Sequence, residues 1–157
     1  MLGRPGVTRR PGTLAALLSA VVLAGCRADT VPLDLRTIAR SGKPNDALAC
    51  PPGLCRAAAD RDGPFFELPV DQLSARVAAI LSGRPRTELV AEDRDLHQLV
   101  FVQRSAVFGF PDTVRVQAVA SGSGSALIVY SRSNYGHWDF GVNRARVERW
   151  LRMLVAG

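Results

Sequence analysis

The chain is 157 residues long and carries a formal net charge of +6, and Lys43 is its only lysine. This length suits one domain together with processing segments. The basic residues form no cluster, and no recognisable nucleic-acid-binding module accompanies them, so charge and motif content argue against a nucleic-acid partner.

The first 25 residues have the organisation of a secretory signal peptide. Arg4, Arg9 and Arg10 supply a positive amino-terminal region, and residues 14–24 form an apolar run too short to span a bilayer as a finished helix. Small residues and Cys26 follow. We therefore predict that the protein is exported and that residues 1–25 are removed, which would lower the net charge to +3 because three arginines and no acidic residue are lost.

The tetrad Leu23-Ala24-Gly25-Cys26 resembles the lipobox of bacterial lipoproteins. The resemblance implies cleavage before Cys26 and attachment of a diacylglyceryl group, which would anchor the mature chain to a membrane. Arg27 stands where an aspartate would favour inner-membrane retention in enteric-type bacteria, so we expect a lipid-anchored protein of the outer membrane, facing the periplasm. The alternative is an ordinary signal peptide followed by a chance cysteine.

Two further cysteines, Cys50 and Cys55, are separated by only four residues. In an oxidising compartment this pair predicts a disulfide that closes a tight loop, with a modest gain in stability because the loop is short. A metal site that combines them with His97 and His137 is the rival interpretation. The spacing is not that of a usual metal-binding pair, so we expect no metal ion, and nothing in the sequence indicates another cofactor.

The region before the predicted domain has no periodic apolar pattern. Residues 26–44 are polar and charged and include Pro32, Gly42 and Pro44, which is typical of a tether between a membrane and a domain. We expect a single folded domain over residues 45–157 that begins with a loop.

The rest of the chain predicts two helices and four strands. A helix is expected from Val70, capped by Asp71, to Gly83, because apolar residues recur at helical spacing. A second helix is expected over residues 143–155. Strands are expected over 87–92, 96–104, 113–120 and 126–132. Hairpin connections favour an α+β fold with an antiparallel sheet of about four strands and two amphipathic helices packed on one face.

The third of these strands alternates cleanly between apolar and polar residues. Val114, Val116 and Ala118 are expected to face inward, whereas Arg115 and Gln117 are expected to face outward. This alternation is typical of a strand with one face on the core and the other in solvent.

Polar residues are concentrated between the last strand and the last helix, over residues 131–146. The segments that follow are similar to motifs of the bacterial family called domain of unknown function 1499: Phe110-Pro111-Asp112 before a strand, Ser131-Arg132-Ser133, Gly136, Asp139, Gly141, Asn143-Arg144 and Arg146-Val147. Pro44-Asn45, ahead of Cys50, is similar to its amino-terminal signature. The resemblance covers about residues 45–154 and implies a small exported or lipoprotein-like protein, but no activity.

The first interpretation of residues 131–146 is a structural clasp. Gly136 and Gly141 permit a sharp turn, and Asp139 or Asn143 is able to cap the last helix. Arg132 would then pair with Asp139 across the turn.

The second interpretation is a binding site for an anionic or amphiphilic ligand. The guanidinium groups would act with the serine hydroxyls and the helix N-terminus as donors to a carboxylate or phosphate. Tyr135 and Trp138 would form an apolar wall or touch the membrane. The proposed donors are Ser131, Arg132, Ser133, Arg144 and Arg146.

The third interpretation is a cell-envelope hydrolase that uses Ser131 or Ser133 with His137 and Asp139. No nucleophile-elbow sequence surrounds these serines. We therefore expect a non-catalytic envelope lipoprotein that binds a partner protein or an anionic, amphiphilic ligand, with the hydrolase as the alternative.

Overall fold

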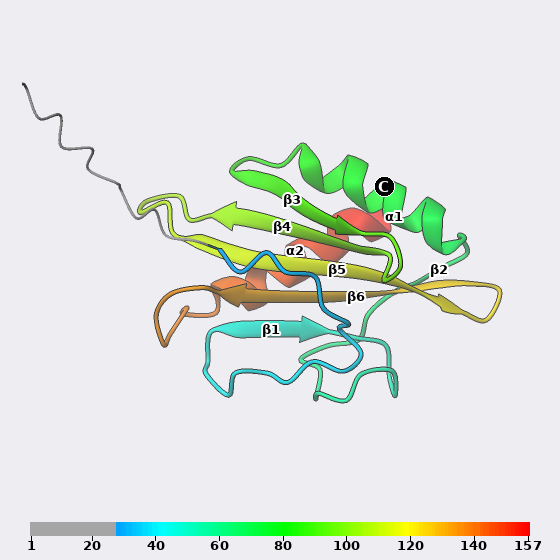
Figure 1. Ribbon diagram of the computed structural model, residues 1–157, viewed down its shortest axis with the longest axis horizontal. Coiled ribbons are helices and arrows are strands. Elements are labelled where there is room, and N and C mark those ends of the chain that lie inside the picture. Colours follow the sequence, from blue (N-terminus) through cyan, green and yellow to red (C-terminus); the bar gives the residue numbers. More distant parts are fainter. Residues whose placement is uncertain (1–27) are drawn as a thin grey trace, which may run out of the picture.

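A computed structural model describes residues 28–157 of the chain (Figure 1). The predicted signal peptide and Cys26 lie outside these residues. The fold is α+β, as predicted, with two helices and an open antiparallel sheet. The sheet has six strands, so two more strands than expected are present. No helix within residues 28–157 is long and apolar enough to cross a membrane.

The strands follow the order β1-β6-β5-β4-β3, and β2 also pairs with β6. The four predicted strands correspond to β3–β6, whereas β1 and β2 were missed because four and two residues are too few to show an alternating pattern. The elements are β1 (Asp46–Ala49), β2 (Phe65–Phe66), α1 (Val70–Ser82), β3 (Thr87–Asp93), β4 (Gln98–Arg104), β5 (Pro111–Ser121), β6 (Gly124–Ser133) and α2 (Val142–Ala156).

Both helices pack on one face of the sheet, where they bury the main hydrophobic core (Figure 1). The Trp150 ring of α2 meets Phe101 of β4 edge-on, with ring centroids 5.6 Å apart. The apolar stripe of α1 is buried against the same face. The prediction that Asp71 caps α1 was wrong, because Pro69 occupies the N-cap position and Asp71 lies within the first helical turn.

The other face of the sheet is covered by residues 28–38, which we call the amino-terminal strap. Leu35 and Ile38 of the strap are buried in a second apolar cluster with residues from β1 and β6. The backbone of the strap also bonds to the sheet, where the Leu35 amide donates to Gln117 Oε1 at 2.7 Å. Within the predicted tether over residues 26–44, the strap therefore packs on the sheet as part of the folded body.

The strap also explains an unexpected burial. Arg115 and Gln117 lie on the face opposite Val114, as predicted, but both are only 1% exposed. The Arg115 guanidinium donates to the carbonyl oxygens of Asp29 and Val31. Their alternation with apolar residues predicted exposure to solvent. Their polar side chains instead form hydrogen bonds with backbone groups of the strap.

A disulfide joins Cys50 and Cys55, as predicted from their spacing. It closes the loop after β1, and both cysteines pack against the apolar cluster beneath the strap. His97 and His137 are not combined with these sulfur atoms. Residues 28–157 contain no group of three or more potential metal ligands.

Candidate functional site

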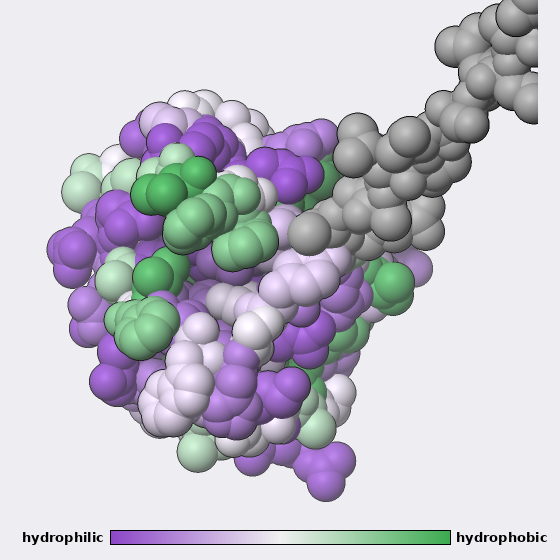
Figure 2. Space-filling view, turned by 90° about the vertical axis from the view of Figure 1, so that its left-hand side faces the viewer, coloured by the Kyte–Doolittle hydropathy of each residue, from purple (hydrophilic) through white to green (hydrophobic). Residues whose placement is uncertain are grey.

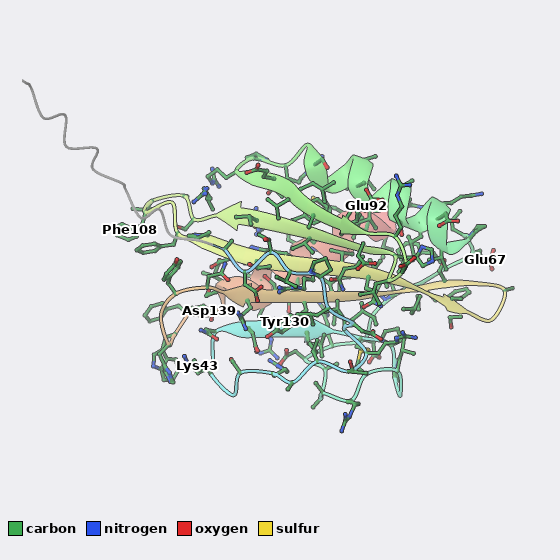
Figure 3. All side chains as sticks on the ribbon, viewed as in Figure 1. Lys43, Glu67, Glu92, Phe108, Tyr130 and Asp139 are labelled. Carbon is green, nitrogen blue, oxygen red and sulfur yellow. A yellow bond between two sulfur atoms is a disulfide. The ribbon has the colours of Figure 1, made fainter. Side chains whose placement is uncertain are left out.

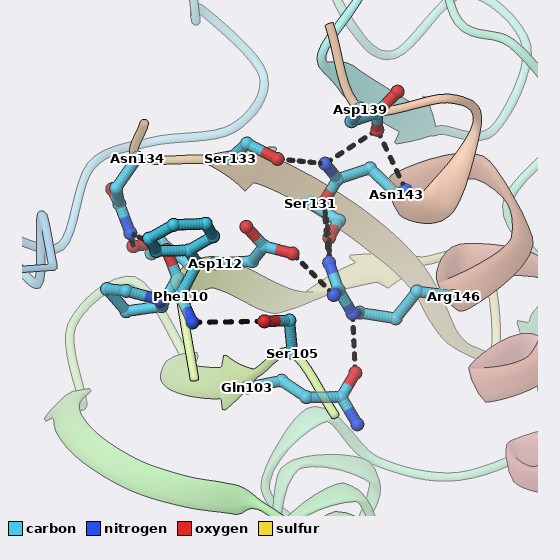
Figure 4. Close-up of polar contacts among 12 residues, drawn as sticks. Gln103, Ser105, Phe110, Asp112, Ser131, Ser133, Asn134, Asp139, Asn143 and Arg146 are labelled. Carbon is cyan, nitrogen blue, oxygen red and sulfur yellow. Dashed lines mark hydrogen bonds and ion pairs between the residues drawn. The ribbon is translucent and has the colours of Figure 1, made fainter. Parts of the chain in front are cut away.

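Arg146 of α2 lies at the centre of a buried polar network between that helix and the sheet (Figure 4). Its side chain is 3% exposed and forms an ion pair with Asp112 of β5, with Nη2 and Oδ2 2.6 Å apart. Nη1 donates to Ser131 Oγ at 2.9 Å and to Asn143 Oδ1 at 2.6 Å, and Nε donates to Gln103. Each of the three guanidinium nitrogens therefore donates to at least one protein acceptor.

Asn143 connects this network to three other parts of the chain. Its side-chain amide lies 3.0 Å from the Asn45 carbonyl oxygen, 2.9 Å from Ser133 Oγ and 2.7 Å from Asp139 Oδ2. Its Oδ1 accepts from Ser131 as well as from Arg146. Asn143, in the first turn of α2, thus binds the residue before β1, the end of β6 and the loop before α2.

Asp139 occupies the amino-terminal end of α2. Its Oδ1 accepts from the Gly141 amide at 2.9 Å, and its Oδ2 accepts from the Asn143 amide at the same distance. Gly141 holds the N-cap position with φ of 78°, a conformation that favours glycine. The N-cap residue is therefore neither Asp139 nor Asn143, but the Asp139 carboxylate, two residues before the N-cap, satisfies amides that the helix leaves free.

The predicted pairing of Arg132 with Asp139 was wrong. Arg132 Nη2 instead lies 3.3 Å from Asp29 Oδ2 of the strap, and Asp29 Oδ1 lies 3.0 Å from Arg115. The reason is the alternation of a strand, because Ser131 and the Asp139 carboxylate lie on the helix side of β6 whereas Arg132 points to the strap side. The ion pair that joins helix to sheet is Arg146–Asp112.

Four participants in these contacts were not among the predicted site residues: Asn45, Gln103, Asp112 and Asp29. A signal for Asp112 was present in the sequence. It has the same parity as Val114 and Val116, so strand alternation places its carboxylate on the core face, where a charge requires a partner. Arg146 falls on the apolar stripe of α2 next to Val147 and faces the same core.

The serines and histidine of the hydrolase interpretation do not form a triad. Ser131 is 0% exposed, and its hydroxyl is shared between Asn143 and Arg146. Ser133 accepts from Asn143. The His137 ring contacts the Trp138 ring, and no hydrogen bond links it to either serine in the described part of the chain. This geometry gives the hydrolase alternative no support.

A surface hollow of about 470 Å³ lies outside the network, at the loop before α2. Lys43 and Asp139, labelled in Figure 3, lie on this side of the molecule. Trp138 and Phe140 provide an apolar wall. The lining residues are Arg40, Lys43, Pro44, Asp46, Asp60, Trp138, Asp139, Phe140, Gly141 and Arg144. Of the predicted donors, Arg144 faces this hollow.

Charged groups in the hollow differ in whether they are already paired. Arg40 lies 2.5 Å from Asp46 and 3.0 Å from Asp60. Burial acts to lower the pKa of Arg40, but the hydrogen bonds and charges of these two carboxylates raise it above its usual value. The exposed Lys43 and Arg144 side chains make no ion pair with any residue of 28–157. They are the cations that a bound anion would meet.

The comparison with known protein families matches residues 47–154 to a family described as "Protein of unknown function (DUF1499)". This range begins in β1 and ends in α2, so it contains the Arg146–Asp112 pair together with Ser131 and Asn143. The strap precedes it. A search of curated proteins finds no match to the chain.

Proposed function

Because the chain belongs to the DUF1499 family of proteins of unknown function, we propose that it is a non-catalytic lipoprotein of the bacterial cell envelope that binds an anionic, amphiphilic ligand. Its anchor would be a diacylglyceryl group joined to Cys26 through a thioether, in the outer membrane and facing the periplasm. The ligand would occupy the hollow before α2. The Arg146 network would hold α2 and the adjoining loop in place.

The composition of the hollow carries this proposal. Lys43 and Arg144 form no ion pair with carboxylates of residues 28–157, and both side chains are able to bind a phosphate or carboxylate group. Trp138 is 64% exposed and Phe140 is 96% exposed, so aromatic surface for an apolar chain lies next to these cations. A small site with convergent polar groups and an apolar wall is the usual form of a ligand site.

The acidic residues of the hollow are bound to groups other than these two cations. Asp46 and Asp60 are paired with Arg40, and Asp139 accepts hydrogen bonds from the first amides of α2. The charged lining has no net charge, because three carboxylates face Arg40, Lys43 and Arg144, but Lys43 and Arg144 are the two cations whose side-chain donors are not bound to these carboxylates.

The contacts of the two serines near α2 favour binding over catalysis. Ser131 is buried and bonded at both its donor and acceptor positions. Ser133 is engaged by Asn143, and His137 lies against Trp138. Ser131 and Ser133 thus serve as structural hydrogen-bond partners.

The test is a titration with dihexanoylphosphatidic acid, a short-chain anionic lipid, followed by nuclear magnetic resonance of backbone amides. We expect saturable shifts at Lys43 and Arg144 and none with dihexanoylphosphatidylcholine at the same concentrations. Lys43→Gln with Arg144→Gln should abolish the shifts, whereas the matched control Arg149→Gln, an exposed arginine of the same helix, should keep them. Equal shifts in both variants would contradict the proposal.

A further inference from the structure

Two loops carry exposed apolar side chains at one end of the sheet. They leave the sheet side by side, because Arg104 pairs with Pro111 across β4 and β5, and Asp112 pairs with Ser133 across β5 and β6. We call their exposed apolar residues the apical face: Val107, Phe108 and Phe110 from the loop after β4, and Tyr135, Trp138 and Phe140 from the loop after β6. Figure 2 shows apolar side chains gathered on this end of the molecule.

The first of these loops holds its aromatic side chains outward. The Ser105 amide donates to the Phe110 carbonyl at 2.9 Å, and the Phe110 amide donates to Ser105 Oγ at 3.0 Å. Arg104 Nη1 donates to the Gly109 carbonyl. The Phe108 and Phe110 rings contact each other, with centroids 5.6 Å apart, yet Phe108 is 76% exposed. Because its backbone is bonded across the loop, the aromatic pair does not fold back onto the core.

The amino-terminal strap begins at this same end. The Asp29 amide donates to Asn134 Oδ1 at 3.2 Å, and Thr113 Oγ1 donates to the Asp29 carbonyl at 2.9 Å. The Asp29 carboxylate is paired with Arg115 and Arg132. Asp29 is thus fixed to the ends of β5 and β6, where the two loops leave the sheet.

The position of Asp29 limits the distance between the domain and a lipid on Cys26. Three residues span at most about 10 Å when fully extended. The headgroup layer on each side of a bilayer is itself roughly 5–8 Å thick. A chain anchored at Cys26 therefore has too little length to hold the sheet away from the membrane, and the end that contains Asp29 must meet the headgroups.

We propose that the apical face lies in the headgroup layer of the phospholipid bilayer that holds the anchor. This inference rests on the proposed lipid at Cys26. Aromatic side chains favour the boundary between water and hydrocarbon, where a ring is buried in part and its polar edge stays hydrated. The exposed Arg104, which forms no ion pair within residues 28–157, flanks the face and attracts anionic lipid headgroups.

This orientation also gives the hollow a source of ligand. Trp138 and Phe140 belong both to the apical face and to the lining of the hollow. The hollow then opens at the depth of the headgroups, with Lys43 and Arg144 facing phosphate groups of the same leaflet. An anionic phospholipid reaches it by lateral diffusion.

The two tryptophans supply an internal test. Trp138 lies on the apical face, whereas Trp150 is 1% exposed in the core between α2 and the sheet. The acylated protein would be placed in phosphatidylethanolamine–phosphatidylglycerol vesicles whose lipids are brominated near the top of one acyl chain. We expect bromine to quench wild-type fluorescence severalfold more than that of Trp138→Phe, which reports Trp150 alone. Equal quenching in the two proteins would overturn the proposal.

Contact of the apical face with the bilayer and acylation of Cys26 are tested by separate measurements. Phe108→Ser with Phe110→Ser should reduce quenching of Trp138, whereas Val155→Ser, an exposed apolar residue at the end of α2, should leave it unchanged. Unchanged quenching in the phenylalanine variant would contradict the role of the apical face. The intact mass of the same preparation reports acylation, so a mass without lipid refutes the anchor and this inference together. An acylated protein without quenching refutes only this inference.

Discussion

Replacement of Arg146 by methionine tests whether the buried network holds α2 to the sheet. Methionine keeps much of the length of the apolar stem but removes the charge and all donors. The Asp112 carboxylate, whose side chain is 10% exposed, then has no cationic partner. Gln103 Oε1 also loses its donor, whereas Ser131 and Asn143 keep the hydrogen bond between them.

The expected loss follows from these orphaned groups. Removing one partner of a buried ion pair costs about 3–5 kcal/mol, because the remaining charge is uncompensated. A small domain has only about 5–15 kcal/mol of stability. We therefore expect Arg146→Met to lower the free energy of unfolding by about 4 kcal/mol, and to lower the melting temperature by about 10–15 °C.

Urea unfolding monitored by circular dichroism measures this loss, provided that the slope with denaturant is unchanged. The control is Arg144→Met, which removes an exposed arginine two positions earlier and should change stability by no more than about 0.5 kcal/mol. Adding Asp112→Leu to Arg146→Met should restore part of the loss, since no unpaired charge remains. A loss below about 1 kcal/mol for Arg146→Met would refute the reasoning.

Three further predictions test other parts of the fold. Leu35→Ala should cost about 2–5 kcal/mol of unfolding free energy, because the strap buries this side chain completely; a loss near zero by urea unfolding would show that the strap does not pack. Burial, followed by the hydrogen bond and charge of Asp46, raises the pKa of Tyr130. The tyrosine therefore ionises more readily in the unfolded chain, so its contribution to stability is complete below pH of about 10 and declines above it. Tyr130→Phe should flatten that alkaline decline in urea unfolding measured across pH, and an unchanged slope would contradict the assignment. Replacing Cys50 and Cys55 by serine should cost about 2 kcal/mol because the closed loop is short; calorimetry of the oxidised protein and the variant measures the difference, and complete unfolding of the variant would show that the loop has a larger role.

The sequence was sufficient for the fold class and for the four long strands. Alternation along β5 and the apolar stripe of α2 are strong patterns, because each element packs one side on the same core. The bounds of α1 also followed from its periodicity and from the glycine that ends it. These elements were predictable because their patterns depend on local spacing alone.

The strap was not predictable in this way. It is neither a helix nor a strand, so its sequence has no periodic pattern, and its buried apolar side chains are those of Leu35 and Ile38. Its packing depends on polar residues far along the chain, because Arg115 donates to the Val31 carbonyl and Gln117 accepts from the Leu35 amide. Polar residues at alternate strand positions usually indicate a face exposed to solvent. A face covered by a strap that hydrogen-bonds to those residues has the same sequence pattern.

Part of the buried network was predicted from the sequence, but its pairing was not. Ser131, Asn143 and Arg146 do converge, and Asp139 does bind the amides of α2. The error was to pair Arg132 with Asp139 because they are near in sequence. Strand parity separates them and places Asp112 on the core face instead.

The intact mass of the protein isolated from the cells that produce it is the most direct test of a lipid-anchored chain. We predict a mature chain that begins at Cys26 and carries a diacylglyceryl group with fatty acyl chains, and a Cys26→Ser variant that carries none. A mature chain of unmodified mass, or one that begins at another residue, would contradict both the anchor and the placement of the domain on the bilayer.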